Sequence, residues 1–308
     1  MVEAIKVEDL NYSYSDGTKA LEDIGLTIYE GEKVVVVGPN GAGKTTFFLH
    51  LNGTIKNPQG DVRVFGKRIS DMKIEDRIHQ VGVVFQDPDD QLFMPTVFDD
   101  VAFGPINMGL DEEEVEKRVN KALSKVGLEG FEKKVSHNLS YGQKKRVALA
   151  AVLSMEPKVL VLDEPTANLD PKSRADFISL ISDLNERDGI TTIIAMHDVN
   201  ALPTLADRVY VLNKRIVAEG SPRDIFSDWS LLKDNSLEAP DVFKLFKVLN
   251  CFGYSSDDLP LSFDEAVEVL TRTIEGTEGH IHLHIHEHTH KEISHVMDSY
   301  NHHRNGKK

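Results

Sequence analysis

The sequence predicts an α/β protein whose central sheet is covered by helices on both faces. Short, largely apolar runs at 33–37, 159–162 and 191–195 are typical of buried strands, which are apolar on both faces. Helical patterns separate these runs along the chain. Strands that alternate with helices favour a parallel sheet, because each crossover helix packs onto a face of that sheet.

The other elements follow in order along the chain. Residues 3–9 and 24–29 alternate apolar and polar positions, as strands with one exposed face do, and a further strand is expected at 81–85. Residues 209–212 and 216–218 favour a closing hairpin around Asn213 and Lys214. Helices are expected at 45–51, 112–126, 142–154, 171–185, 242–249 and 263–274.

Changes in pattern divide the chain into parts. Residues 88–156 are dominated by helical patterns, so we expect a helical subdomain inserted into a core that spans 1–226. Two amphipathic segments separated by a breaker-rich stretch predict a small helical extension over 227–277. Residues 278–308 are polar and rich in histidine, and we expect a flexible tail there.

Composition limits the classes of function. The 308-residue chain is 40% hydrophobic, which is enough for a packed core, and its net charge of -15 argues against nucleic acid as a partner. A single cysteine excludes an internal disulfide and suits a reducing compartment. We expect no signal peptide, and no run approaches the ~18 apolar residues of a membrane span. We therefore expect a soluble chain, for which docking on a membrane protein stays open.

A glycine-rich loop directly follows the apolar run at 33–37. The pattern G-x-x-x-x-G-K-[ST] is met by Gly38, Pro39, Asn40, Gly41, Ala42, Gly43, Lys44 and Thr45. In such loops, glycines let backbone N–H groups approach phosphate oxygens, and the positive end of the following helix points at the same oxygens. Lys44 adds charge for the β- and γ-phosphates, and Thr45 offers a hydroxyl to Mg²⁺. We interpret this loop, with the adjacent Thr46, as a nucleotide-binding site.

Two acidic residues end the apolar run at 159–162. Asp163 is placed to hold the Mg²⁺ shell through water, and Glu164 is placed to polarise an attacking water as general base. Taken alone, an apolar run that ends in two acids is also typical of a strand entering a loop. The phosphate-binding loop elsewhere in the chain favours the catalytic interpretation.

The motifs over about residues 1–225 resemble those of the ATP-binding-cassette ATPases and occur in the same order. The signature-like segment consists of Leu139, Ser140, Tyr141, Gly142 and Gln143. Ser140 is a natural N-cap for the helix that follows. Tyr141 stands where the commonest family pattern has glycine, and it would be penalised if that position required positive φ. The resemblance implies a P-loop (RecA-like) ATPase core with an antiparallel β subdomain, acting on ATP with Mg²⁺.

The resemblance also implies roles for single residues. Gln86 corresponds to the glutamine that joins the Mg²⁺ and water site to the helical subdomain. His197 corresponds to the switch histidine that contacts the γ-phosphate and orients the water. Tyr14 corresponds to the aromatic residue that stacks on adenine, with Tyr12 as an alternative. Asp170 belongs to a segment that resembles the loop crossing between subunits.

A head-to-tail dimer follows from the resemblance, formed with an identical or a different ATPase subunit. Its two ATP sites would each combine the phosphate-binding loop of one subunit with Ser140 and Gly142 of the other. Gln143 completes the same signature segment. The extension at 227–277 resembles a part that helps to pair two ATPase subunits.

Residues 86–110 resemble more narrowly the ATPase subunits of energy-coupling-factor transporters for cobalt or nickel and for vitamins. In that group the segment shapes a groove for a helix of the membrane scaffold. The contacting side chains would be the apolar Leu92, Phe93, Met94, Val97 and Phe98 and the acidic Asp87, Asp89, Asp90, Asp99 and Asp100. The alternative is that these apolar side chains pack inside the helical subdomain. Integral-membrane scaffold and substrate-binding subunits, and a peripheral place on the cytoplasmic face of the cell membrane, are implied.

Histidine occupies every second position near the end of the sequence. The residues are His280, His282, His284, His286, His288 and His290. Neutral imidazole is a good ligand for Ni²⁺, Co²⁺ and Zn²⁺, so the tail is a candidate transition-metal site. Alternate residues of one flat strand lie ~6–7 Å apart, too far for ideal chelation, so a flexible tail or two paired tails would be needed. A solvated tail without a metal role is the alternative.

The histidines and the resemblance together favour an ATPase that energises import of cobalt or nickel ions. One alternative is a general energising ATPase of a vitamin-type transporter with an incidental tail. Another is a non-transport cassette ATPase acting on nucleic acid or ribosomes. Such a protein would normally have two cassettes or an inserted arm, and a net charge of -15 fits it poorly.

Overall fold

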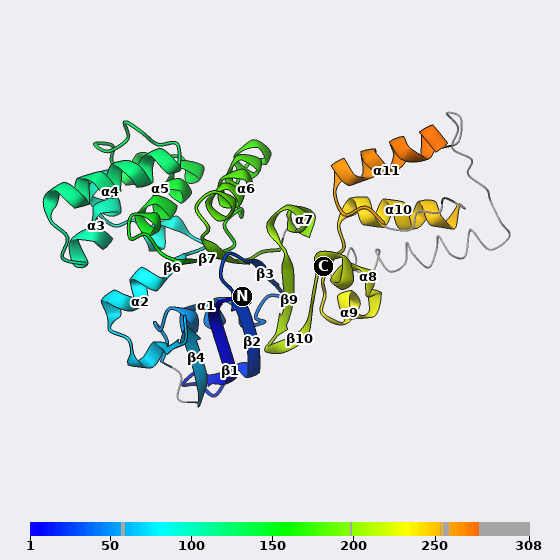
Figure 1. The fold of residues 1–308 in the computed structure, drawn as a ribbon, viewed down its shortest axis with the longest axis horizontal. Coiled ribbons are helices and arrows are strands. Elements are labelled where there is room, and N and C mark those ends of the chain that lie inside the picture. The colour runs from blue at the N-terminus through cyan, green and yellow to red at the C-terminus, as the bar shows by residue number, and fades with distance from the viewer. Residues whose placement is uncertain (57–58, 198, 253, 255–258, 277–308) are drawn as a thin grey trace. The chain divides into compact units, whose positions relative to one another are not determined.

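The computed structural model describes the chain except residues 57–58, 198, 253, 255–258 and 277–308 (Figure 1). The chain forms two compact units, each described below by itself. Residues 1–197 and 204–221 make the first unit, and the second contains 198–203 and the chain from Pro222 onward. Within the described part, no helix combines the length and the apolar character needed to cross a bilayer.

A mostly parallel sheet forms the centre of the first unit. Its strands are β3 (Lys33–Val37), β6 (Val81–Val84), β7 (Val159–Asp163), β8 (Thr191–Ala195), β9 (Arg208–Asn213) and β10 (Arg215–Gly220). The described strands lie in the order β10-β9-β3-β8-β7-β6, with an antiparallel β9–β10 hairpin at one edge. Every residue of β7 and β8 is buried, and so is every residue of β3 except Lys33, which confirms the interpretation of the three apolar runs as buried strands.

Helices connect the parallel strands, as the alternating pattern predicts. They are α1 (Lys44–Leu51), α2 (Ile74–Gln80), α6 (Pro171–Glu186) and the short α7 (Leu202–Leu205). The predicted helices at 45–51 and 171–185 are confirmed to within one residue at each end. Asp170 caps α6 by accepting hydrogen bonds from the backbone N–H groups of Lys172 and Ser173.

A second, antiparallel sheet carries the expected β subdomain. It contains β1 (Glu3–Ser13), β2 (Lys19–Tyr29), β4 (Gln59–Val64) and β5 (Lys67–Arg68), and the 3₁₀ turn η1 (Ile69–Asp71) follows. The order among the described strands is β2-β1-β4-β5. One hydrophobic core joins this sheet to α1 and the central sheet, with Ile5 and Leu10 packed in the same cluster as Phe47 and Val161. The phosphate-binding loop is therefore anchored from both sheets.

The helical subdomain consists of α3 (Val97–Asn107), α4 (Glu112–Lys125) and α5 (Tyr141–Leu153), with the 3₁₀ turns η2 (Pro88–Asp90) and η3 (Ser136–Asn138). The three helices pack on one another and form a distinct group within the first unit (Figure 1). Each begins at a capping side chain, from Thr96, Asp111 and Ser140 respectively. The helices predicted at 112–126 and 142–154 are confirmed to within one residue at each end.

The second unit is helical where it is described. Its elements are η4 (Val199–Ala201), α8 (Pro222–Ser227), α9 (Trp229–Asp234), α10 (Asp241–Cys251) and α11 (Phe263–Gly276). The helices predicted at 242–249 and 263–274 are confirmed as α10 and α11. Phe246, Tyr254 and Ala266 form a small core between them. The domain boundary expected at residue 226 stays a prediction.

Candidate active site

The phosphate-binding loop lies where the central strand β3 ends and α1 begins. Gly43 has φ 97°, which favours glycine, and it directly precedes the first residue of the helix. A Cβ on Gly38 would overlap the backbone carbonyl of Leu212 in β9, so only glycine fits there. The loop therefore passes tightly against the sheet and presents the start of α1 to a ligand.

Lys44 is buried within this loop. The residue is only 7% exposed. Its Nζ donates hydrogen bonds to the carbonyl oxygens of Gly38 (2.8 Å) and Pro39 (3.2 Å). Burial lowers the pKa of Lys44, while the charges of Glu164 and Asp163 oppose that shift. The loop thus holds a cation at its centre, which suits the binding of phosphate oxygens.

Thr45 and Asp163 meet beneath the loop. The Thr45 hydroxyl donates a hydrogen bond to Oδ2 of Asp163 at 2.5 Å, although the two residues lie far apart in the sequence. Asp163 ends β7, and burial raises the pKa of its carboxyl, with the Thr45 hydrogen bond opposing the shift. A hydroxyl and a carboxylate are hard oxygen donors that Mg²⁺ prefers. A hydroxyl ligand beside a carboxylate that acts through water fits an ion that keeps several waters and also binds phosphate.

Glu164 lies between two polar partners from neighbouring strands. Its Oε1 is 2.7 Å from Nε2 of His197, which lies just past β8. Its Oε2 accepts a hydrogen bond from Nε2 of Gln86, which lies just past β6, at 3.1 Å. The carboxyl ends of parallel strands β6, β7 and β8 therefore converge here, where α/β sheets bind their ligands. A carboxylate held in this way can accept a proton from water.

The signature segment forms the start of α5. Ser140 and Gln143 make a reciprocal capping box, in which the Gln143 N–H donates to the Ser140 hydroxyl and the Ser140 N–H donates to the Gln143 side chain. Tyr141 is the first helical residue and has no positive φ. The departure from glycine at this position is therefore accommodated without backbone strain. Gly142 lies in the first turn, next to Leu169 and Ser173.

Tyr14, which directly follows β1, lies beside the phosphate-binding loop. Tyr14 is 43% exposed, and its hydroxyl is 2.6 Å from the hydroxyl of Thr46 in α1. Tyr12 is partly buried and packs edge-on against His50 and against Tyr14. Tyr14 is thus the more accessible ring for a flat ligand, and Thr46 fixes its hydroxyl.

Two expected site residues, Ser140 and Asp170, have no described hydrogen bond to this cluster. In the part of the chain that the structure describes, the hydrogen bonds of Ser140 and Asp170 stay within the first turns of α5 and α6. The six alternating histidines lie outside the described residues. Elsewhere, in the described part, no group of three His, Cys, Asp or Glu side chains is arranged to hold a metal ion.

One buried residue at the site was missed by the sequence analysis. Lys145 in α5 donates a hydrogen bond from Nζ to the backbone carbonyl of Glu164 at 2.9 Å. The available signal was a lysine four residues before the buried Leu149, on the apolar face of the helix. Lysine at such a position is rarely buried without a specific partner.

Comparisons with known proteins identify relatives over most of the chain. The sequence pattern of the family described as ABC transporter matches residues 21–167. Energy-coupling factor transporter ATP-binding protein EcfA from Methanothermobacter thermautotrophicus is 48% identical over 275 residues, covering 88% of each chain. The protein of the same name from Methanocaldococcus jannaschii is 47% identical over 273 residues, covering 88% of this chain and 96% of its own.

Solved structures show the same fold. One is cbiO1 from Clostridium perfringens, described as part of the ABC transporter complex cbiONQ. It is 44% identical, with a TM-score of 0.67, and the match covers 76% of this chain and 94% of that one. Another is a dimeric ATP-binding cassette in a post-hydrolysis state bound to ADP and Pi. It is 29% identical, with a TM-score of 0.65, and the match covers 71% of this chain and 99% of that one.

Proposed function

Because the chain belongs to the ABC transporter family of ATP-binding proteins, we propose that it is the ATPase subunit that energises an energy-coupling-factor importer. The two relatives named for this transporter type support the proposal over 88% of the chain. ATP hydrolysis coupled to transport is the activity of the family.

The observation that carries the proposal is the convergence of Gln86, Glu164 and His197 beside the phosphate-binding loop. Glu164 accepts a proton from the attacking water, because its carboxylate lies where the carboxyl ends of β6, β7 and β8 converge. His197, whose Nε2 is 2.7 Å from the Glu164 carboxylate, orients that carboxylate and contacts the γ-phosphate. Gln86 holds the other carboxylate oxygen, so the base has one defined orientation.

The loop residues bind and orient the nucleotide. Lys44 and the N–H groups of the loop hold the phosphates, and Tyr14 stacks on the adenine. Thr45 and Asp163 would hold Mg²⁺, which when bound neutralises charge on the phosphate oxygens. Their existing hydrogen bond keeps the hydroxyl and the carboxylate side by side before any ion binds.

We place the second half of each ATP site on a partner ATPase subunit. Ser140 and Gly142 lie at the N-terminus of α5, whose positive end suits a γ-phosphate. Within the described contacts, Ser140 and Asp170 do not join the phosphate-binding loop of their own chain, which supports a role across a dimer interface. A similar cassette has been solved as a dimer bound to ADP and Pi.

The membrane scaffold would dock on the helical subdomain. Phe93 is 58% exposed and stacks edge-on against the exposed Phe103, and the exposed Ile106 lies on the same helix as Phe103. Of the residues expected to line this groove, Leu92, Val97 and Asp100 are buried instead. Asp100 accepts hydrogen bonds from the N–H groups at 93 and 94, so it shapes the loop and cannot meet a basic partner.

For the cargo we propose cobalt or nickel ions. The support is the alternating histidines of the tail, together with the resemblance of residues 86–110 to a group that serves cobalt or nickel as well as vitamins. A vitamin-type transporter with an incidental tail is the second candidate. Co-purification with a small multi-span membrane subunit, followed by uptake of ⁶³Ni²⁺ or ⁵⁷Co²⁺, tests the choice. Binding of a vitamin by that complex in place of metal uptake would favour the second candidate.

Glu164→Gln tests the catalytic assignment. Turnover should fall at least about 100-fold, because the amide cannot accept the proton, while ATP binding persists and an ATP-bound dimer accumulates. Phosphate release and size-exclusion chromatography with ATP measure the two effects. Lys44→Ala is the matched control for binding, and it should weaken ATP affinity instead. Normal hydrolysis by Glu164→Gln would rule out Glu164 as the base.

A further inference from the structure

Lys145 is a buried cation that the mechanism above does not use. It lies in α5, one turn after Tyr141, and is 3% exposed. Burial lowers the pKa of its ammonium group to about 8, with the charges of Glu164, Asp87 and Asp163 opposing the shift. A buried charge is costly unless specific partners compensate it. Its place in a largely apolar helix therefore needs an explanation.

The described partner of the ammonium group is the backbone of the proposed general base. Nζ of Lys145 donates a hydrogen bond to the carbonyl oxygen of Glu164 at 2.9 Å, and it also lies 5.7 Å from the ring centre of Tyr141. The helix α5 belongs to the helical subdomain, whereas Glu164 directly follows the core strand β7. This hydrogen bond thus joins the subdomain to the residue that the hydrolysis depends on.

The backbone of Glu164 has an uncommon conformation. Its φ is 46°, in the left-handed region that residues other than glycine rarely adopt. Its N–H donates to the carbonyl of Ala195, and its carbonyl also accepts from the N–H of Ala167. Such a conformation persists only where the surrounding contacts hold it. With this backbone conformation, the Glu164 carboxylate lies between Gln86 and His197.

We propose that Lys145 is a positioning residue for Glu164. By holding the Glu164 carbonyl, it fixes the backbone conformation that aims the carboxylate, and it ties the orientation of the helical subdomain to hydrolysis. The inference rests on the role proposed for Glu164. Without Lys145 the carbonyl would still accept from Ala167, so the chain keeps its fold while the carboxylate loses its single orientation.

Lys145→Met tests this role, because methionine has similar length and no N–H donor. The full chain is assayed for steady-state ATP turnover, together with its membrane partners where turnover requires them. We expect kcat to fall about tenfold or more through loss of a charge-assisted hydrogen bond, with KM for ATP unchanged within about threefold. Lys145→Gln keeps a donor without the charge and should recover part of kcat. The melting temperature reports folding for both variants.

Two further variants separate the possible failures. Lys144→Met is the matched control, since Lys144 is the next residue in α5 and pairs with Asp89 instead (2.7 Å); it should keep wild-type kcat. Wild-type kcat in Lys145→Met would overturn the inference. So would a fall in kcat that comes with a higher KM and a lower melting temperature and that glutamine does not reverse. Retained turnover in Glu164→Gln would instead show that the proposed function of Glu164 is wrong.

Discussion

His50 illustrates how a single residue near the site is tuned by its surroundings. It lies in α1 and is 1% exposed, with Nδ1 2.7 Å from the Thr46 carbonyl and the Tyr12 ring packed edge-on against it. Its Nε2 is buried with no described hydrogen-bond partner. Burial lowers the pKa of His50 from 6.5, so the folded chain holds it in the neutral form.

A pH dependence of stability follows from His50. The unfolded chain, with the ordinary pKa of 6.5, binds more protons at this residue than the folded chain in the window below that value. The contribution of neutral His50 to the free energy of unfolding is fully present above pH 6.5 and is lost as the pH falls. His50→Phe should therefore flatten the fall in free energy of unfolding between about pH 7.5 and 5.5. Urea titrations at several pH values measure it, and equal slopes in both proteins would contradict the prediction.

At the scale of residues, the sequence predicted what is contiguous and missed what depends on tertiary packing. Gly38 to Thr45 form one local segment, so the pattern alone placed Lys44 and Thr45 together. Lys145 meets Glu164 only because α5 packs against the end of β7, and no spacing in the sequence encodes that distance. The choice between Tyr12 and Tyr14 as the accessible ring likewise depended on which ring the core buries.

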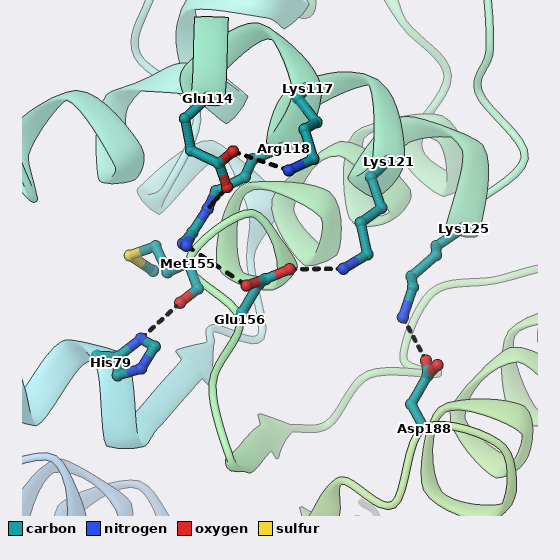
Figure 2. Close-up of polar contacts among 9 residues, drawn as sticks. All are labelled: His79, Glu114, Lys117, Arg118, Lys121, Lys125, Met155, Glu156 and Asp188. Carbon is teal, nitrogen blue, oxygen red and sulfur yellow. Dashed lines mark hydrogen bonds and ion pairs between the residues drawn. The ribbon is translucent and has the colours of Figure 1, made fainter. Parts of the chain in front are cut away.

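At the scale of elements, α4 is fastened to the core by ion pairs, which Figure 2 shows. Lys121 and Arg118 contact Glu156 at 2.6 and 3.4 Å, and Lys125 pairs with Asp188 at the loop before β8. Glu156 lies in the connection from α5 to β7 and has φ 52°. Beside it, the Met155 carbonyl is 3.0 Å from Nδ1 of His79 in α2. These contacts bring the end of the helical subdomain against two core loops.

Glu156→Gln tests this fastening. The hydrogen bond from Lys121 and the charges of Lys121 and Arg118 lower the pKa of Glu156, but its side chain is 39% exposed, so solvent screens the pairs. We expect a loss of about 0.5–1 kcal/mol in free energy of unfolding at low salt, smaller in 1 M NaCl. Urea unfolding at both salt concentrations measures it.

Lys117→Gln is the matched control for Glu156→Gln. Lys117 pairs with Glu114 of the same helix, so this change should leave the contact between α4 and the core intact. Equal losses in the two variants would show that the ion pairs act within α4 and do not fasten it to the core.

Among the elements, long periodic segments were predictable and short or interrupted ones were not. The buried strands and α4 follow from uniform or strongly amphipathic patterns. The helix α3 contains Gly104 and Pro105, which blur its period, although Thr96 gives it a clear cap. The two-residue β5 and the helices α8 and α9 are too short to produce a recognisable repeat, so packing against their neighbours decides their structure.

At the scale of the whole molecule, exposed apolar side chains occur in both units. Phe93 and Phe103 lie in the first unit, while Leu245 in α10 and Phe263 and Val267 in α11 lie in the second. Exposed apolar groups of this kind are typical of surfaces that meet partners. We propose that the first meets the membrane scaffold and that the second helps to pair two ATPase subunits. The sequence indicated both segments, but which side chains point outward required the fold.

Transition-metal binding by the histidine-rich tail can be tested on the whole chain. Neutral imidazoles at alternate positions from 280 to 290 should bind Ni²⁺, Co²⁺ and Zn²⁺, and protons should displace the metal as the pH falls below about 6.5. The described residues hold no cluster of three metal-ligating side chains, so a chain truncated after Gly279 should not bind at micromolar concentrations. Isothermal titration without nucleotide compares the two chains.

A full-length chain with those six histidines changed to glutamine is the sharper control, because it keeps the length and polarity of the tail. It should behave like the truncated chain if imidazole is the ligand. If it binds metal like the wild type, the alternating histidines are incidental, and the proposal of a metal cargo rests on family resemblance alone. If added metal changes the ATPase rate of the wild type, and the glutamine variant loses both metal binding and that change in rate, the tail couples metal binding to turnover.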